Sequence, residues 1–370
     1  MINKQPRGSM GIFVSENSGT VPFSESEFCR KLCLIGRKRG ISVYVFTPSS
    51  VNANRSSVLG YSFDNGGWQQ KLYAPPDIVY DRCFAYERKM IQRKHTALNR
   101  LSELHRFIYL TRGLSGKWTV YQALKRYPEL VPHLPETVLY SNEAQLAHWL
   151  DAHQGEAFLK PQQGTHGKRA LYVMSPAFTS KLQLTGRDGD NRVLRRQFRS
   201  RDEGLGFIDT FIGERSFILQ PYLELVTSHG KPFDIRALMQ KNDRGSWELT
   251  GLAARIGAKE SITSNLHGGG TPRQAEPFLQ AEFGPAKGNS IAAKIRELAL
   301  TIPACLESQF GRLAELGIDF GVDRAGNVWV LETNSKPGRS SFFRIGDTVS
   351  ARKSIENPIL YARYLLLSKP

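Results

Sequence analysis

The stretch GIDFGVDRAGNVWVLETNSKPG, residues 317–338, most narrowly limits how this chain can fold. Residues 317–322 and 327–334 are rich in Val, Ile, Leu, Phe and Trp, as β-strands are. The tetrapeptide Asp-Arg-Ala-Gly between them is typical of a tight turn. The pattern therefore predicts a β-hairpin near the end of the chain.

Three oxygen-bearing side chains share one face of this predicted hairpin. Glu332 and Asn334 alternate along one strand, so they point the same way, and Asp319 lies opposite them on the partner strand. Two carboxylates and an amide suit a hard cation whose remaining ligands are phosphate oxygens and water. We therefore predict a site for magnesium with a nucleotide. The alternative is a solvated hairpin face with ordinary acidic residues.

Length and charge bound the class of protein. At 370 residues the chain is long enough for two or three packed units. Its formal net charge of +16 favours anionic partners such as nucleotides, acidic peptides, cell-wall polymers or nucleic acid, and does not choose among them. The four cysteines have no metal-binding spacing, which favours a reduced, cytoplasmic protein. No run of about 20 apolar residues is present, so we expect no membrane span.

The first hundred residues alternate between strand patterns and a helix pattern. Three apolar runs predict buried strands: residues 10–15, 41–46 and 77–82. Residues 24–39 have the spacing of a helix, with Ser24 as the expected N-cap and Gly40 just past its end. This βαβ order predicts a partly parallel sheet covered by helices. A glycine-rich patch at residues 113–116 marks a domain boundary, and residues 117–127 predict a further helix.

The sequence FLKPQQGTHGKR, residues 158–169, predicts a phosphate-binding loop. Lys160 ends a strand, and the loop after it contains Gly164 and Gly167. Backbone amides of such a loop can fold over a phosphate while the lysine supplies positive charge. The spacing is not that of a Walker loop. The alternative is an ordinary hairpin, with residues 171–174 as the returning strand.

The segment FILQPYLEL, residues 217–225, predicts a strand that is interrupted at Gln220 and Tyr222. Backbone groups of a short extended segment, here as far as Leu223, can hydrogen-bond the edge of an adenine. Glu224 follows where a carboxylate can hold ribose hydroxyls. The alternative is a plain strand with an edge proline.

Two charged residues interrupt the apolar strand KPFDIRALMQ. Asp234 and Arg236 lie on one face of it, an unusual place for charges unless they meet a ligand or each other. Arg255 follows in the next strand-like run, GLAARIG. Arg339, after the hairpin, can address an acidic substrate or pair with an acid such as Asp347.

The sequence NLHGGG, residues 265–270, predicts a loop in close approach to a ligand, because consecutive glycines lose much conformational entropy when they are fixed. Asn265 and His267 lie at its mouth, and Gly268 and Gly269 lie within it. A mobile loop is the alternative, and a histidine in such a place is more often an ordinary loop residue than a catalyst.

Five arginines form the densest basic stretch: Arg192, Arg195, Arg196, Arg199 and Arg201. We interpret it as a solvated strand face near the nucleotide lobe. A nucleic-acid site is the alternative, but only Phe198 is interleaved for base stacking. Nucleic acid is therefore not the expected partner.

Taken in order, these motifs resemble the ATP-grasp fold, and most closely the YheC/YheD group of endospore-coat-associated ATP-grasp proteins. Three stretches carry the resemblance: DIRALMQKNDRGSWELTGLAARIG, SITSNLHGGG and LGIDFGVDRAGNVWVLETNSKPG. The resemblance covers about residues 111–345. It implies an α/β fold with an N-terminal βαβ-type pre-ATP-grasp domain in residues 1–110, a first ATP-grasp lobe in 111–219 and a second in 220–370.

The resemblance also implies roles for single residues. ATP contacts would come from lysines, a glycine loop and a hinge segment: Lys117, Lys160, Gly164, Gly167, Gln220, Tyr222, Leu223 and Glu224. Magnesium ligands would lie on the hairpin: Asp319, Glu332 and Asn334. The catalytic group facing the transferred phosphoryl would be Arg236, Arg255 and Asn265. The substrate would meet the remaining positions: Asp234, His267, Gly268, Gly269 and Arg339.

Ligases of this fold activate a substrate carboxylate as an acyl phosphate, which an amine then attacks, and they need no protein nucleophile. The resemblance thus implies an ATP- and Mg2+-dependent carboxylate–amine ligase in the cytoplasm, with an acidic small molecule or peptide as substrate and a setting in spore-envelope formation. One alternative is a non-catalytic ATP-binding scaffold of the spore coat. Another is a phosphotransferase that stops at a phosphorylated product.

Overall fold

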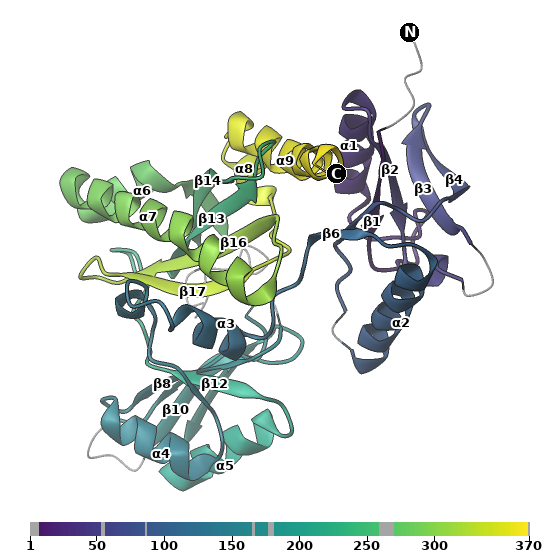
Figure 1. The fold of residues 1–370 in the computed structure, drawn as a ribbon. Coiled ribbons are helices and arrows are strands. Elements are labelled where there is room, and N and C mark those ends of the chain that lie inside the picture. The colour runs from purple at the N-terminus through teal and green to yellow at the C-terminus, as the bar shows by residue number, and fades with distance from the viewer. Residues whose placement is uncertain are drawn as a thin grey trace.

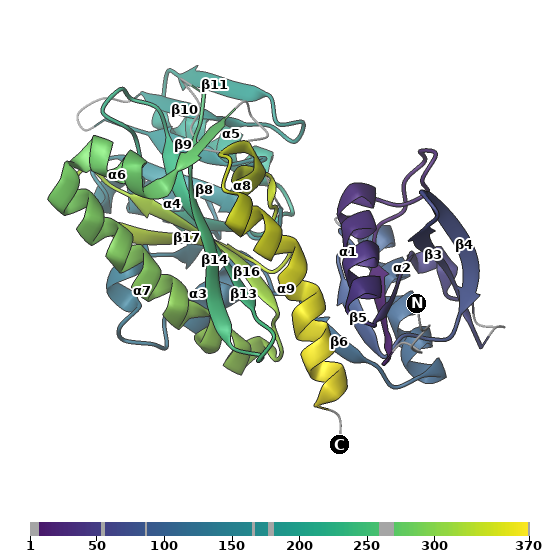
Figure 2. The same cartoon turned by 90° about the horizontal axis from the view of Figure 1, so that it is seen from above.

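The computed structural model describes residues 7–52, 56–85, 87–164, 167–176, 181–258 and 270–368. Three β-sheets follow one another along the chain, and helices pack on each of them (Figure 1). The first sheet stands to one side of the other two, beyond helix α9 (Thr348–Leu367), as Figure 2 shows from a second direction.

The first sheet has the strand order β4-β3-β2-β1-β5-β6. Its parallel strands are β1 (Ser9–Phe13), β2 (Ser42–Phe46), β5 (Ile78–Asp81) and β6 (Ile108–Thr111). The hairpin of β3 (Val58–Asp64) and β4 (Gly67–Tyr73) extends one edge, and the main helices are α1 (Ser26–Lys38) and α2 (Arg88–Leu104). The predicted βαβ order is confirmed.

Helix α1 begins at Ser26, later than the sequence predicted. Glu25, in the left-handed conformation with φ of 56°, holds the N-cap position in place of Ser24. Its carboxylate accepts hydrogen bonds from Arg82 Nε at 2.9 Å and Nη2 at 2.6 Å. Arg82 is far from Glu25 in the sequence. Local capping preferences, which favoured Ser24, therefore did not predict where the helix begins.

The second sheet is antiparallel, with the order β11-β10-β9-β8-β12-β7. Its strands are β7 (Val138–Leu139), β8 (Glu156–Pro161), β9 (Leu171–Met174), β10 (Leu182–Arg187), β11 (Val193–Phe198) and β12 (Phe217–Gln220). Helices α4 (Glu143–Ala152) and α5 (Arg201–Ile212) share a core with Leu159 and Leu171. Because side chains alternate along a strand, Lys160 and Tyr172 lie on the opposite face.

The third sheet has the order β15-β14-β13-β16-β17 and is also antiparallel. Its strands are β13 (Phe233–Lys241), β14 (Trp247–Ile256), β15 (Thr271–Gln274), β16 (Glu315–Val322) and β17 (Val328–Asn334). The last two form the predicted hairpin, whose turn is closed by Gly326 with φ of 84°. The predicted hairpin is therefore confirmed.

Helices cover the two faces of the third sheet differently. Helices α6 (Ala275–Phe283) and α7 (Pro285–Phe310) share a core with Ile235 and Ala237 of β13. Helix α8 (Ser340–Arg344) and α9 pack on the other face, where Leu238 and Ala253 are buried. Arg236 alternates with Ile235 and Ala237, so it lies on this second face.

Two helices link the sheets. Helix α3 (Lys117–Leu124) packs against α7 through Val120 and Leu124, although it precedes the second sheet in sequence. Helix α9 reaches from the third sheet to the first, where its Ile355 and Ile359 are buried in the core below α1. Within the described ranges, every helix is too short or too polar to span a lipid bilayer.

The predicted domain ranges 1–110, 111–219 and 220–370 correspond to one sheet each, apart from β6 and β12, which end one residue beyond their ranges. Helices α3 and α9, however, pack on cores outside their own ranges. The boundaries stay a prediction.

Candidate functional site

A cavity of about 350 Å³ lies where α3, the second sheet and the third sheet meet. Its polar lining includes Lys117 of α3, Lys160 and Gln220 of the second sheet, and Glu332 and Asn334 of β17. Apolar side chains complete the walls: Val120, Leu124, Leu134, Ile218 and Val330. The size and the mixture of apolar walls with cations suit a small molecule that has an apolar part and an anionic part.

Two lysines approach this cavity from different elements. Lys117 Nζ lies 3.1 Å from the carbonyl oxygen of Gly164 and 3.4 Å from Glu332 Oε1. Lys160 Nζ donates to the carbonyl of Leu331 at 3.2 Å. Burial lowers the pKa of Lys160 to about 8, and Glu332 only partly offsets this. A phosphate in the cavity would relieve the cost of holding both ammonium groups there.

One extra residue in β17, Leu331, marks the point where its register against β16 shifts. Val330 faces the core under α7, so in an unbroken ladder Glu332 and Asn334 would face that core as well. The extra residue sets Glu332 opposite Asp319, and Glu332 and Asn334 both line the cavity. The bulge therefore places Glu332 and Asn334 on the sheet face that carries Asp319.

Asp319 does not line the cavity. Its carboxylate accepts hydrogen bonds from Arg236 Nε and from Arg236 Nη2 at 2.9 Å, and it lies 2.9 Å from Arg255 Nη2. Asp234 holds Arg255 in turn, through contacts of 2.6 and 2.7 Å. Burial alone would raise the pKa of Asp319, but the two arginines hold it below its ordinary value. The charges of this sheet face thus pair across neighbouring strands.

The oxygen atoms facing the cavity fit a magnesium ion that also binds a ligand. Glu332 offers a carboxylate and Asn334 an amide oxygen, both suited to Mg2+. Among the described residues, no group of three or more His, Cys, Asp or Glu side chains can hold a metal ion. A magnesium ion here would therefore depend on further oxygens, as nucleotide phosphates provide. The participation of Asp319 stays a prediction.

The last residue of β12 reaches the cavity, and the segment that follows it packs on the second sheet. Gln220 lines the cavity, and its Nε2 donates to Thr137 Oγ1 at 2.7 Å. Tyr222 stacks on Tyr172 of β9, with ring centroids 3.9 Å apart. This stacking fixes the segment against the face of the second sheet that carries Lys160.

The next two residues lie outside the cavity lining. The carbonyl of Leu223 accepts a hydrogen bond from the N–H of Leu225 at 2.9 Å. Glu224 forms an exposed ion pair of 2.7 Å with Arg324 of the hairpin turn. Contacts of Leu223 with an adenine and of Glu224 with a ribose stay predictions.

The two predicted glycine loops are described to different extents. Gly164 lines the cavity and has φ of 133°, and Gly167 has φ of 69°, both values that favour glycine. Four predicted residues of the second loop lie outside the described residues, and their roles stay predictions: Asn265, His267, Gly268 and Gly269.

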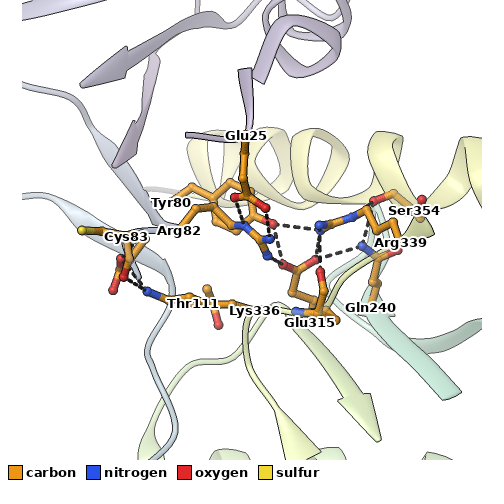
Figure 3. A network of polar contacts seen from close by, with 12 residues as sticks. Glu25, Tyr80, Arg82, Cys83, Thr111, Gln240, Glu315, Lys336, Arg339 and Ser354 are labelled. Carbon is orange, nitrogen blue, oxygen red and sulfur yellow. Dashed lines mark hydrogen bonds and ion pairs between the residues drawn. The ribbon is translucent and has the colours of Figure 1, made fainter. Parts of the chain in front are cut away.

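Arg339 lies in a buried cluster outside the cavity lining (Figure 3), and its contact with a substrate stays a prediction. It donates to the carboxylate of Glu315, to the hydroxyl of Tyr80 at 3.0 Å and to the carbonyl of Ser354 at 2.9 Å. The alternative partner, Asp347, instead caps α9. Glu315 is 1% exposed and needs cationic partners, which the partly exposed Asp347 does not.

The sequence did not predict this cluster, which joins the first sheet to the third (Figure 3). Arg82, directly after β5, holds Glu25 at the start of α1 and lies 3.1 Å from Glu315 Oε1 on β16. A second group of ion pairs lies beside it: Asp81, Lys94 and Lys336. The only sequence signal for the cluster around Glu315 is that Arg82 and Glu315 lie at the ends of apolar runs.

A family profile and two curated proteins that resemble this chain carry the same family name. The family profile described as YheC/D like ATP-grasp matches residues 106–365. The chain is 29% identical over 362 residues to the endospore coat-associated protein YheD of Bacillus subtilis (strain 168), which covers 93% of this chain and 75% of that protein. It is 27% identical over 325 residues to the endospore coat-associated protein YheC of the same organism, which covers 87% of each.

Solved structures share the fold at low sequence identity. The D-cycloserine synthetase DcsG matches with a TM-score of 0.56 at 15% identity, over 96% of this chain and 99% of that chain. The ATP-grasp ligase PsnB, solved in complex with minimal precursor, Mg and ADP, matches with a TM-score of 0.51 at 12% identity, over 98% and 99%. The expected ATP-grasp fold is confirmed. Since the family profile spans well over half of its length, the chain belongs to the YheC/D-like ATP-grasp family.

Proposed function

We propose that this chain is an ATP- and Mg2+-dependent ligase that joins a substrate carboxylate to an amine. The observation that carries the proposal is the cavity in which Lys117 and Lys160 face Glu332 and Asn334. The two ammonium groups suit nucleotide phosphates. The two oxygen ligands suit a magnesium ion that would also bind those phosphates. The ligase fold of PsnB, which was solved with Mg and ADP, supports the same function.

In this proposal the lysines neutralise phosphate charge. A phosphate beside Lys160 restores its lowered pKa, so the bound state holds a full positive charge there. Glu332 and Asn334 would hold a magnesium ion, which would supply positive charge at the phosphate oxygens. Arg255, held by Asp234, is proposed to face the transferred phosphoryl group with a preorganised guanidinium.

The proposed reaction has two steps. An oxygen of the substrate carboxylate attacks the γ-phosphorus of ATP, the bond to the bridging oxygen breaks, and ADP leaves. The amine nitrogen then attacks the acyl carbon and loses a proton, and inorganic phosphate leaves with the electrons of the carbon–oxygen bond. Neither step uses a protein nucleophile. All four cysteines are buried and free, which agrees with both that chemistry and a reducing cytoplasm.

For the substrate we propose an acidic small molecule or peptide that belongs to the spore envelope. The net charge of +16 favours an anionic substrate. The names of the relatives YheD and YheC connect similar chains with the endospore coat.

A second candidate function is a non-catalytic ATP-binding scaffold. One observation favours it: both oxygens of Asp319 contact arginines, so this carboxylate is not directed to the cavity. The test must therefore separate nucleotide binding from turnover.

Glu332→Gln tests the metal site, and Glu214→Gln on the exposed turn after α5 is its matched control. Calorimetry should show magnesium-dependent ATP binding by the wild type and the control. ADP release in the presence of pools of amino acids, peptides and envelope intermediates should fall about 100-fold or more in Glu332→Gln, with normal melting. Binding without ADP release in any pool supports the scaffold. Absence of magnesium-dependent ATP binding contradicts both functions.

A further inference from the structure

Strand β11 forms the rim of the second sheet, away from the first and third sheets (Figure 2). Among the described strands it pairs only with β10. Four arginines on or beside it are exposed: Arg192, Arg195, Arg196 and Arg199. Val193, on the same strand, is 56% exposed. An edge strand of this kind presents backbone groups that another extended chain can pair with.

The register identifies which backbone groups point outward. The N–H of Asp188 donates to the carbonyl of Arg192 at 3.0 Å, which makes these two a hydrogen-bonded pair of the β10–β11 ladder. Hydrogen-bonded and non-hydrogen-bonded pairs alternate in an antiparallel ladder. Val193 and Gln197 therefore direct their N–H and C=O groups away from β10.

Two nearby carboxylates accept hydrogen bonds from backbone N–H groups of this strand or the residues beside it. Asp188 Oδ1 accepts from the backbone N–H of Arg192 at 2.8 Å, and Glu203 Oε2 accepts from that of Arg199 at 3.3 Å. Between described residues, no ion pair engages the guanidinium of Arg192 or of Arg199. The rim thus presents positive charge to solvent.

A continuous sheet face connects this rim to the cavity. Directly paired residues run across five strands from Gln220 through Phe158, Tyr172 and Thr185 to Arg195. Paired residues share one face of a sheet, so this row starts at the cavity wall and ends at the rim. At about 4.8 Å per strand, the rim lies roughly 19 Å from Gln220, a distance that about six extended residues can cover.

We propose that β11 is a docking site for an acidic segment of a peptide substrate, which adds to the sheet as an extended strand. The proposal rests on the proposed ligase function and names its substrate class. Backbone groups of Val193 and Gln197 pair with the peptide, and Arg192 and Arg199 bind its carboxylates. A nucleic acid suits the rim less well, because Phe198 packs against Phe207 of α5, with ring centroids 5.2 Å apart.

The test measures peptide binding without ATP, so it does not depend on turnover. The probe is a fluorescein-labelled peptide of about ten residues in which Glu alternates with Thr, long enough to cover β11. Fluorescence anisotropy should show that R192E/R199E weakens binding at least tenfold, because two contacts become repulsive. The control R93E/R100E makes the same charge change on exposed positions of α2 and should bind like the wild type.

A pair of variants at Gln197 separates strand pairing from charge attraction. Gln197→Pro removes an outward N–H and leaves the ladder to β10 intact, so it should weaken binding at least fivefold without changing the melting temperature. Gln197→Ala keeps the N–H and should bind like the wild type. The proposal fails if the wild type does not bind the peptide, which leaves the arginines as protection of an open edge. It also fails if Gln197→Pro binds normally or if an oligothymidine of equal charge binds as tightly. Peptide binding by a chain without ligase activity would refute the proposed function alone.

Discussion

Lys160 is partly buried, and its ammonium group donates to the carbonyl of Leu331. Burial lowers the pKa of Lys160 from its ordinary value of 10.5 to about 8. Phosphate binds the charged lysine, so ATP affinity should fall as pH rises through about 8, by up to tenfold per pH unit. Calorimetry across this range checks the slope. Lys160→Arg stays charged and should abolish the slope, and an unchanged slope in this variant would show that another group titrates.

The hairpin of β16 and β17 presents Glu332 and Asn334 through its bulge at Leu331. Deleting Leu331 removes only the extra residue, so both side chains should keep facing the cavity. Deleting Thr333 should keep Glu332 in place but turn Asn334 toward the core under α7. Magnesium-dependent ATP binding should therefore survive the first deletion within about tenfold, since one hydrogen-bond acceptor of Lys160 changes, and be lost in the second. The reverse order of affinities would contradict the bulge.

In the molecule as a whole, buried charges join the first sheet to the third. Arg82 pairs with Glu25 and Glu315, and its side chain is 2% exposed. Arg82→Met removes the cationic partner of Glu25 and one of the two cationic partners of buried Glu315, so the free energy of unfolding should fall by about 3–5 kcal/mol in urea titrations. The exposed pair of Arg30 with Glu27 supplies the control, because Arg30→Met should leave the urea midpoint unchanged.

Acid should reduce the difference between wild type and Arg82→Met. Burial alone would raise the pKa of Glu25, but Arg82 holds this pKa below its ordinary value of 4.5. A carboxylate with a lowered folded-state pKa adds stability above its ordinary value, and this is lost as pH falls through the folded value. Urea titrations should therefore converge below a pH of about 4.5. A constant difference across acid pH would mean that the loss in Arg82→Met comes from packing.

Local structure was predictable where neighbouring residues decide it. Strand Leu171–Met174 and the turn that Gly326 closes follow from side-chain alternation and turn chemistry. By the same alternation, Lys160 lies on the sheet face opposite to that of Leu159, which is buried under α4 and α5. The order of the motifs along the chain was also sufficient to recognise the family, because that order is a property of the sequence itself.

Which charges meet was decided only by the tertiary structure. Arg82 and Glu315 are 233 positions apart, and Arg236 and Asp319 are 83 apart. Their pairing depends on which strands the fold brings together and how deeply it buries them, and no local pattern records either. The bulge at Leu331 is of the same kind, since an extra residue exists only relative to the partner strand. The sequence by itself thus determined the elements and the family, and the packing of distant segments determined which side chains face the cavity.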